Sequence, residues 1–363
     1  MFTLPAMKII HRYILSRFIV SLFFAMLFFL TIVICVDLVG NLATFIDKQV
    51  PLNIVGIYYI YYIPYILNTL GLPMAMLLAS MFSIGLLAKH NEIIAIRTVG
   101  VSNYKILSSI IISSFIISCL ALLFSETVVP KASQAKSAIE DEYIKKQRTY
   151  KTYRNILVRD AIGRRIFIAM FSANTNIANR VTVQTFDEER IVERLDIKSM
   201  QWKDGQWQLK SGYKRTFANG FETAVLLPDT TDPYFNFTPE QLTESQTKPE
   251  NMSYLQLNKF IADVERNGGD SKKWAVSLNF KLSLPFSNFI LVLFGAPLAA
   301  GKRRSGAIFG LILSALIFLI YFGMMRFVQT LGELGQIDPL SSAWITNAVF
   351  LMVGLGMLMR ANR

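Results

Sequence analysis

The chain has 363 residues, of which 53% are hydrophobic, and its formal net charge at pH 7 is +12. A composition this apolar excludes an ordinary soluble globular protein. The charge also argues against a nucleic-acid partner, because residues 131–270 hold 21 basic and 19 acidic residues and most of the excess flanks apolar segments.

Six stretches of about 18 or more mainly apolar residues are long enough to cross the ~30 Å hydrocarbon core of a bilayer as helices. They are 18–36, 55–87, 106–125, 282–301, 305–325 and 340–359. The second would measure about 50 Å as one straight helix, so we expect it to break or kink between Pro64 and Pro73.

Basic residues near the ends of these stretches predict the orientation of the chain. With the N-terminus in the cytoplasm, eleven basic residues flank the spans on the cytoplasmic side and five on the opposite side. The positive-inside rule then predicts that both termini are cytoplasmic and that the polar middle of the chain lies outside. We expect three domains: 1–130 with three spans, 131–271 as an outer domain, and 272–363 with three more spans.

The polar middle of the chain has the pattern of β-strands. Apolar and polar residues alternate with a period of two in 180–187, 194–198 and 206–210. Asp204-Gly205 and Asn219-Gly220 are typical two-residue hairpin turns. We therefore predict at least six strands, arranged as a sandwich, a jelly roll or a half-open barrel.

Helices are expected on both sides of this β domain. Residues 131–148 continue as a helix out of the third span. Ser253 and Gln256 have the spacing of a capping box, which predicts the start of a second helix. The glycine-rich segment 267–269 predicts where that helix ends.

A polar segment between the second and third spans predicts a short amphipathic helix at the membrane surface, at about 89–100. Ile93 and Ile96 are spaced to share one face of it. Glu92 and Arg97 supply its charges, and Gly100 stands where a helix would end. Either this helix docks into a groove of a soluble partner, or it lies on lipid headgroups.

Residues able to perform catalysis or to bind metals are scarce. The two histidines, His11 and His90, lie on the predicted cytoplasmic side, and Cys35 and Cys119 lie in apolar stretches, where we expect them to pack. This predicts no metal site and no Ser-His nucleophile in the outer domain. The segment 295–302 is not a phosphate-binding loop, since five residues separate its glycines instead of four. We expect no catalytic residues and no cofactor bound by this chain.

Three basic residues on the predicted outer side suggest contact with an anion. Lys48, Lys281 and Arg326 lie at or near the ends of spans, where a charge is costly unless it faces water or an anion. They either contact the headgroup of an anionic lipid substrate or extend to ordinary lipid phosphates. Gly306 and Gly310 allow close helix approach and mark the fifth span as an interface or gate.

Four motifs occur in the order found in one known family. They are NEIIAIRTVGVS at 91–102, SETVVP at 125–130, PLAAGKRRSG at 297–306 and DPLSSAWITN at 338–347. With an outer domain inserted after the third span, the whole chain resembles the permease subunits of the lipopolysaccharide-transport exporter. These subunits are of an F or a G type, and the chain has a slight preference for G.

This resemblance implies a multi-pass protein of the inner membrane of Gram-negative bacteria that takes lipopolysaccharide from the outer leaflet. It would pair with a second F/G-type permease on a dimeric cytoplasmic ATPase, which uses ATP and Mg²⁺. Glu92, Ile93, Ile96 and Arg97 would couple the chain to that ATPase. The outer domain would be a jelly roll that passes lipid to a single-span jellyroll protein and a periplasmic bridge. The first and fifth spans would line the lipid cavity and its lateral gate.

One departure concerns the substrate contacts. Some G-type members have a lysine just before the Val-Asp of the first span, where this chain has Ile34 and Cys35. The basic contact would then move to Lys48 or Arg326. Two other readings stay open: a lipoprotein-releasing or mechanotransmission permease, which typically has four spans, and a membrane-anchored enzyme that acts on envelope lipids through carboxylates such as those at 187–189.

Overall fold

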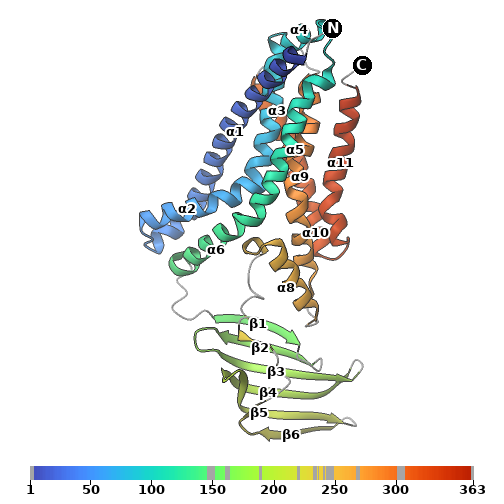
Figure 1. The fold of residues 1–363 in the computed structure, drawn as a ribbon. Coiled ribbons are helices and arrows are strands. Elements are labelled where there is room, and N and C mark those ends of the chain that lie inside the picture. Colours follow the sequence, from blue (N-terminus) through green and yellow to red (C-terminus); the bar gives the residue numbers. More distant parts are fainter. Residues whose placement is uncertain are drawn as a thin grey trace. The chain divides into compact units, whose positions relative to one another are not determined.

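The computed structural model describes residues 4–144, 152–159, 164–187, 190–218, 221–231, 235, 237–239, 242, 249–266, 270–300 and 307–360. The chain forms two compact units, one helical and one built on a β-sheet (Figure 1). Residues 1–144 and 272–363 make up the helical unit, and residues 145–271 make up the β unit. Residues 131–144, which the sequence analysis assigned to the outer domain, therefore lie within the helical unit.

The predicted spans are all helical. Their helices are α1 (Leu4–Asp47), α2 (Leu52–Ile66) with α3 (Leu72–Lys89), α5 (Asn103–Thr127), α9 (Lys272–Ala300), α10 (Ala307–Glu333) and α11 (Pro339–Arg360). By length and composition, the described residues contain six helices able to cross a membrane. Most of them are longer than predicted, because polar residues beyond the apolar stretches continue the helical hydrogen bonding. The 44 residues of α1 correspond to about 66 Å of helix.

The second span breaks where the sequence predicted. A π-helical turn, η1 (Leu67–Gly71), separates α2 from α3. Pro64 lies inside α2, and Pro73 lies in the first turn of α3. Proline cannot donate a backbone hydrogen bond, and a π turn is one way in which a helix accommodates that loss. As a result α2 leaves the bundle at an angle to α3 (Figure 1).

Small residues on α9 let the neighbouring helices approach closely. A Cβ atom added at Gly295 would lie 2.6 Å from Leu77 Cδ1 and 3.0 Å from Ser80 Oγ of α3. One added at Gly354 of α11 would lie 3.2 Å from the backbone nitrogen of Phe294 in α9. On α10, a Cβ added at Gly332 would lie 2.5 Å from Ser342 Oγ of α11, whereas one added at Gly310 would meet nothing within 4 Å. Gly306, the other half of the predicted motif, lies outside the described residues.

Hydrogen bonds made by buried side chains also join the helices. The Tyr321 hydroxyl donates to Asn347 Oδ1 at 2.6 Å, and Asn347 Nδ2 donates to the carbonyl oxygen of Ser283 at 2.9 Å. These two bonds tie α10, α11 and α9 together in an environment where unpaired polar groups are costly.

The two cysteines do not share this core. Cys35 and Cys119 are both exposed, so the expectation that they pack inside is wrong.

The β unit contains the predicted β domain as one antiparallel sheet. Its strands are β1 (Thr152–Arg159), β2 (Arg165–Ser172), β3 (Ile177–Asp187), β4 (Arg190–Lys203), β5 (Gln206–Ala218), β6 (Phe221–Leu227) and β7 (Thr230–Thr231). The order is β1-β2-β3-β4-β5-β6, with β7 beside β5. Because each strand from β1 to β6 pairs with the next along the chain, the described strands form a meander. The connectivity expected of a jelly roll, two Greek keys, is not present among them.

The predicted turn and cap signals have clear outcomes. Asp204 and Gly205 have φ values of 52° and 78° between β4 and β5, as a type I′ turn requires, so this hairpin is confirmed. The turn predicted at 219–220 lies outside the described residues.

The capping box of α8 (Tyr254–Arg266) is confirmed. The Ser253 amide donates to Gln256 Oε1 at 2.9 Å, and the Gln256 amide donates to Ser253 Oγ at 3.3 Å. The segment 267–269 lies outside the described residues.

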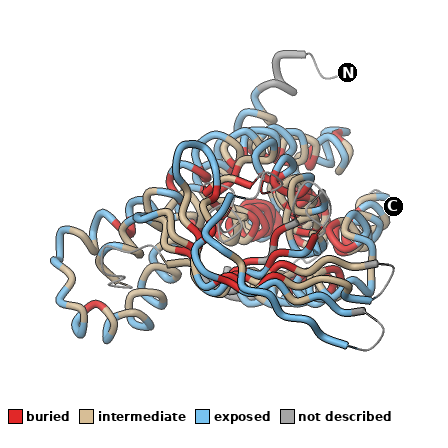
Figure 2. The backbone as a smooth tube through the Cα atoms, turned by 90° about the horizontal axis from the view of Figure 1, so that it is seen from below, coloured by how far each residue is buried: buried red, intermediate tan, exposed pale blue. Residues whose placement is uncertain are grey.

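The inner face of the sheet is a packed hydrophobic core. Alternate residues of β1 to β5 are buried there, and Trp207 is fully enclosed. Phe235, Phe237 and Leu242 pack against these residues, and Trp207 Nε1 donates to the Phe237 carbonyl at 2.8 Å. Figure 2 shows buried residues gathered within the helical bundle and along the sheet. The apolar face of the described strands is therefore filled by the chain's own side chains.

The close contact at Gly295 yields a prediction. Gly295→Val should lower the free energy of unfolding by about 1–3 kcal/mol, because the added atoms overlap Leu77 and Ser80 of α3. Thermal unfolding of the purified chain in detergent measures this loss. Gly310→Val is the matched control and should leave the midpoint unchanged, and equal effects of the two changes would contradict the proposed packing.

Candidate functional site

The short amphipathic helix predicted between the second and third spans is α4 (Glu92–Thr98). It is shorter than the predicted 89–100, because Lys89 is still part of α3 and Asn91 adopts a left-handed backbone with φ of 60° that breaks the helix. Gly100, with φ of 87°, follows its end as predicted. The segment is therefore a helix of about two turns, flanked by Asn91 and Gly100, whose backbones both have left-handed φ values.

The two isoleucines of α4 face the inside of the chain. Ile93 is buried in the core of the helical unit, and Ile96 packs against the same core. This chain thus covers Ile93 and part of Ile96, and the coupling role expected of these two residues stays a prediction. The outward face presents other residues, namely Ile94, Ala95, Arg97, Thr98 and Val99, which are all exposed. Ile94 is 39% exposed and Val99 is 48% exposed, so this face is partly apolar.

Glu92 connects α4 to the first span. The Tyr13 hydroxyl of α1 donates to Glu92 Oε2 at 2.8 Å, and Arg17 donates in turn to the Tyr13 oxygen. Glu92 Oε1 lies 3.8 Å from Arg17 Nη2 and 3.8 Å from His90 Nδ1. We call these contacts among Tyr13, Arg17 and Glu92 the joint between α1 and α4. The sequence did not predict it, since 79 residues separate Tyr13 from Glu92. The only hint was the i, i+4 spacing of Tyr13 and Arg17, which places them on one face of α1.

The three basic residues expected on the outer side are not gathered at one point. Lys48 follows the end of α1, at the corner between α1 and α2, which lies apart from α9 and α10 (Figure 1). Lys281 is half-buried on α9. Arg326 is exposed on α10, where its guanidinium lies 4.9 Å from the centroid of the Phe322 ring and donates to Gln329 Oε1 at 2.9 Å. A lipid contact by these residues stays a prediction.

The corner between α1 and α2 holds an acidic residue of the first span. Asp37 Oδ2 accepts a hydrogen bond from the Tyr59 hydroxyl at 2.9 Å and one from Asn41 Nδ2 at 3.1 Å. Helix α6 (Val129–Ile139) adds Lys136, whose Nζ lies 3.8 Å from the centroid of the Tyr62 ring. Asp37 thus receives two hydrogen bonds within an apolar helix, which lowers the cost of its charge. The tyrosine-rich segment 58–65 was the only sequence signal for this cluster.

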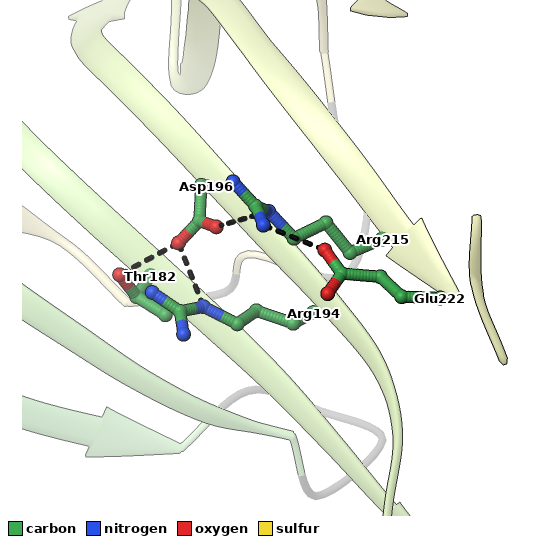
Figure 3. Close-up of polar contacts among 5 residues, drawn as sticks. All are labelled: Thr182, Arg194, Asp196, Arg215 and Glu222. Atoms are coloured by element: carbon green, nitrogen blue, oxygen red, sulfur yellow. Dashed lines mark hydrogen bonds and ion pairs between the residues drawn. The ribbon is translucent and has the colours of Figure 1, made fainter. Parts of the chain in front are cut away.

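Charged residues form a ladder across β4, β5 and β6 (Figure 3). Arg194 and Arg215 occupy directly opposed positions on β4 and β5, an arrangement that repulsion would disfavour. Asp196 lies between them: its Oδ1 accepts from Arg194 Nε at 2.8 Å, and its Oδ2 lies 3.1 Å from Arg215 Nε. Thr182 donates to Asp196 Oδ1 at 3.2 Å, and Arg215 Nη1 donates to Glu222 Oε1 at 2.6 Å.

The electrostatics of this ladder indicate a structural role. The hydrogen bond and charge of Glu222 raise the pKa of the Arg215 guanidinium, and the charge and hydrogen bond of Asp196 raise it further. Both carboxylates are therefore engaged by arginines, which favours strand registration over acid–base chemistry. Within the described ranges, no group of three or more His, Cys, Asp or Glu residues could hold a metal ion.

Comparison with known proteins identifies similar chains. Residues 12–360 match the family described as lipopolysaccharide export system permease LptF/LptG. The chain is 18% identical over 294 residues to the permease protein LptG of Escherichia coli strain K12, which covers 80% of this chain and 81% of that protein. Identity to LptG of Haemophilus influenzae is 20% over 237 residues, which covers 64% of this chain and 65% of that protein. Identity to LptF of E. coli strain K12 is 24% over 86 residues, 24% of each chain.

These matches confirm the family predicted from the four sequence motifs. The two LptG proteins align over more of the chain than LptF does, in the direction of the slight preference for the G type.

The charged ladder yields a prediction. Asp196→Asn should speed amide hydrogen exchange in β4, β5 and β6 of the full chain by a factor of roughly two to five, the size expected of cross-strand charge pairs. The cause is that Arg194 and Arg215 would then face each other without a negative charge between them. Asp204→Asn is the control and should change nothing, since Asn-Gly also suits the type I′ turn. Unchanged exchange in Asp196→Asn would show that the ladder does not stabilise these strands.

Proposed function

The chain belongs to the LptF/LptG family of lipopolysaccharide export system permeases, and from this we propose that it extracts lipopolysaccharide from the outer leaflet and passes it to a periplasmic bridge. The family and the six apolar helices make it a multi-pass protein of the inner membrane and a transporter component rather than a stand-alone enzyme. Relatives of both types, LptF and LptG, imply a second permease subunit as its partner in the export system.

The division of α4 into an inward and an outward face carries the proposal that a partner ATPase supplies the energy. The inward side is fixed to the helical unit by Ile93 and by the contacts of Glu92 with α1. The outward side, with Ile94 and Arg97, is free for a groove in a cytoplasmic protein. A helix fixed on one face and open on the other can transmit movement from a partner to α1 and α3.

The structure around Gly295 supports the proposal that the energy comes from a partner and not from a nucleotide bound there. Gly295 lies in the interior of α9, and the helix continues to Ala300. The backbone amides of residues 295–300 therefore lie within a helix, whereas a phosphate-binding loop presents free amides to the nucleotide. Moving a lipid with several acyl chains costs about 0.8 kcal/mol for each CH₂ group exposed to water. Extraction thus needs ATP and Mg²⁺ bound by a partner, which we propose is a dimeric cytoplasmic ATPase.

The arrangement of the helical unit supports the proposed orientation. The start of α1, helix α4 and the end of α11 lie at one end of this unit, and α6 and the start of α9 lie at the other (Figure 1). If α4 meets a cytoplasmic ATPase, both termini are cytoplasmic and the β unit, inserted between α6 and α9, is periplasmic. The eleven-to-five distribution of basic residues agrees with this orientation.

The edge of the sheet is the proposed route toward the bridge. Among the described strands, β6 pairs only with β5, and its other edge is open. Phe221 is 79% exposed, and Val225 and Leu226 are also exposed. An open edge with apolar side chains can accept a strand from another β domain, such as that of a single-span jellyroll protein.

On α9 and α10, we propose that Lys281 and Arg326 contact anionic groups of the substrate. We also propose that Gly310, where an added Cβ would meet nothing within 4 Å in this chain, faces the second permease.

The outward face of α4 yields a prediction. Arg97→Glu should reduce the amount of ATPase that co-purifies with the permease in mild detergent at least tenfold, because it reverses an exposed charge in the proposed contact. Lys105→Glu is the matched control, since Lys105 is an exposed cation just beyond α4. Equal retention of the ATPase by both variants would rule out this face as the contact.

Glu92 should behave differently from Arg97. Glu92→Ala removes the hydrogen bond to Tyr13, so we expect at least a fivefold loss of lipopolysaccharide exported per ATP hydrolysed, with the ATPase still bound. Glu92→Gln keeps an acceptor for the Tyr13 hydroxyl and should be milder. Measurement of both rates in proteoliposomes tests this, and full export efficiency in Glu92→Ala would disprove the role of the joint.

A further inference from the structure

The alternation of buried and outward residues shifts along one line that crosses β3, β4 and β5. Buried residues normally recur at every second position of a strand. At this line the spacing is three, between Ala178 and Val181 of β3, between Ile197 and Met200 of β4, and between Leu209 and Gly212 of β5. Each strand therefore has one additional residue here. Three exposed residues at the line are Arg180, Lys198 and Ser211, which we call the offset row.

The offset row departs from ordinary strand backbone. Arg180 and Ser211 have φ values of 51° and 48°, in the left-handed region that residues other than glycine rarely adopt. A Cβ added at Gly212 would lie 2.7 Å from the carbonyl oxygen of Asp196, so β5 lies closely against β4 beside the row. Strained backbone of this kind is concentrated at functional sites. The strain directs attention to what the offset row could bind.

A groove with a volume of about 590 Å³ lies over the offset row. Its lining includes the three residues of that row and the next outward row, Thr182, Asp196 and Tyr213, which pair across β3, β4 and β5. Thr182 and Asp196 are also members of the charged ladder (Figure 3). Sites for small molecules commonly have volumes of ~300–1,000 Å³, so the groove has room for more than a lone inorganic anion. All of its lining residues belong to the β unit.

Two cations of the offset row face each other without an acidic partner. The register of β3 and β4 is continuous on either side of the row and places Arg180 opposite Lys198. Like charges at directly opposed positions of a sheet repel each other. Among the residues that the structure describes, no side chain forms an ion pair or a hydrogen bond with either cation. This repulsion is therefore uncompensated within the described part of the chain.

The charged ladder on the same face shows how such a repulsion is relieved. Arg194 and Arg215 also lie opposite each other, but both contact the carboxylate of Asp196. An anion bound from outside would serve Arg180 and Lys198 as Asp196 serves the two arginines. The groove over the offset row thus has the charge of an anion site.

The chemistry of the lining favours a phosphate that is carried on a sugar. A guanidinium presents a planar fork of donors that matches two phosphate oxygens, and a lysine adds a second positive charge. Ser211 adds a hydroxyl group to the same lining. Tyr213 lines the groove and is 52% exposed, so its ring offers a flat apolar surface to a sugar ring.

We propose that this groove binds a phosphorylated saccharide, with its phosphate between Arg180 and Lys198 and a sugar ring against Tyr213. The site lies on the face of the sheet opposite the hydrophobic core around Trp207, and its ligand is polar. The site does not rest on the proposed function. Two sources carry this chemistry, a soluble sugar phosphate and the phosphorylated sugar region of lipopolysaccharide, and the experiment separates them.

Isothermal titration calorimetry of the full chain in detergent tests the proposal. The probes are glucosamine 1-phosphate and lipopolysaccharide freed of its acyl chains by alkaline hydrolysis. Tighter binding of the first assigns the site to soluble sugar phosphates, and tighter binding of the second assigns it to the sugar region of lipopolysaccharide. Absence of binding by both probes overturns the proposal. The probe that binds more tightly is then used with the variants.

Paired variants test the cations. Lys198→Gln should weaken binding of the probe at least tenfold, because it removes one of the two charges that hold the phosphate. Arg180→Asn should have an effect of the same size, and asparagine tolerates the left-handed backbone at this position. Lys203→Gln removes an exposed cation of β4 outside the groove and should leave the affinity unchanged. Equal affinities of Lys198→Gln and Lys203→Gln would overturn the site.

Inorganic phosphate tests the saccharide part of the proposal. It should bind at least tenfold more weakly than the sugar-bearing probe. Tyr213→Ala should weaken the sugar-bearing probe at least fivefold and leave the affinity for inorganic phosphate unchanged. If inorganic phosphate binds as tightly as the sugar-bearing probe, or if Tyr213→Ala weakens both equally, the assignment of a saccharide is wrong.

Hydrogen exchange without ligand separates a binding role of Lys198 from a structural one. Lys198→Gln removes the repulsion with Arg180, so amide exchange in β3 and β4 should slow by a factor of roughly two to five while binding is lost. A residue that only supports the fold would give the opposite sign. Faster exchange in Lys198→Gln, together with lost binding, would therefore overturn the proposal.

Discussion

The close contact between α3 and α9 is the constraint on which the helical unit depends. Gly295 lets α9 lie against Leu77 and Ser80 without intervening side chains, so that α3 is held along its length by the centre of the bundle. Helix α4 follows α3 after only two residues, His90 and Asn91. A rigid α3 therefore gives α4 a fixed attachment. A force applied to the outward face of α4 would reach the bundle through this attachment instead of bending a flexible loop.

The contact with α1 provides a second attachment for α4, of a different kind. The core packing of Ile93 is non-directional, whereas the bonds among Tyr13, Arg17 and Glu92 depend on geometry and charge. Most of α1 is exposed within this chain, with only 17% of its most apolar window buried. One side of α1, from Ile14 to Phe29, nevertheless packs into the core of the helical unit.

Among the described strands of the β unit, β6 has one unpaired edge, and the sheet is nevertheless ordered. Its inner face is filled by Trp207 and by residues from the segment after β7. On β4, β5 and β6, alternating charges of Arg194, Asp196, Arg215 and Glu222 fix the register up to the outermost strand. Register fixed by side chains matters most at an edge, because only one neighbour holds such a strand in place. The partner proposed for β6 would then meet its exposed apolar residues in a defined position.

Local patterns alone determined the six apolar helices, the break after Pro64, the hairpin at Asp204-Gly205 and the capping box at Ser253. Each of these rests on neighbours within a few turns or strands, where composition and spacing are sufficient. Tertiary structure decided the rest: that Ile93 and Ile96 pack against the core, that the Tyr13 hydroxyl donates to Glu92, and that the described strands form a meander. Periodicity shows that a helix has an apolar face but not whether that face meets its own chain or a partner. A bond between residues 79 positions apart exists only once the helices have packed.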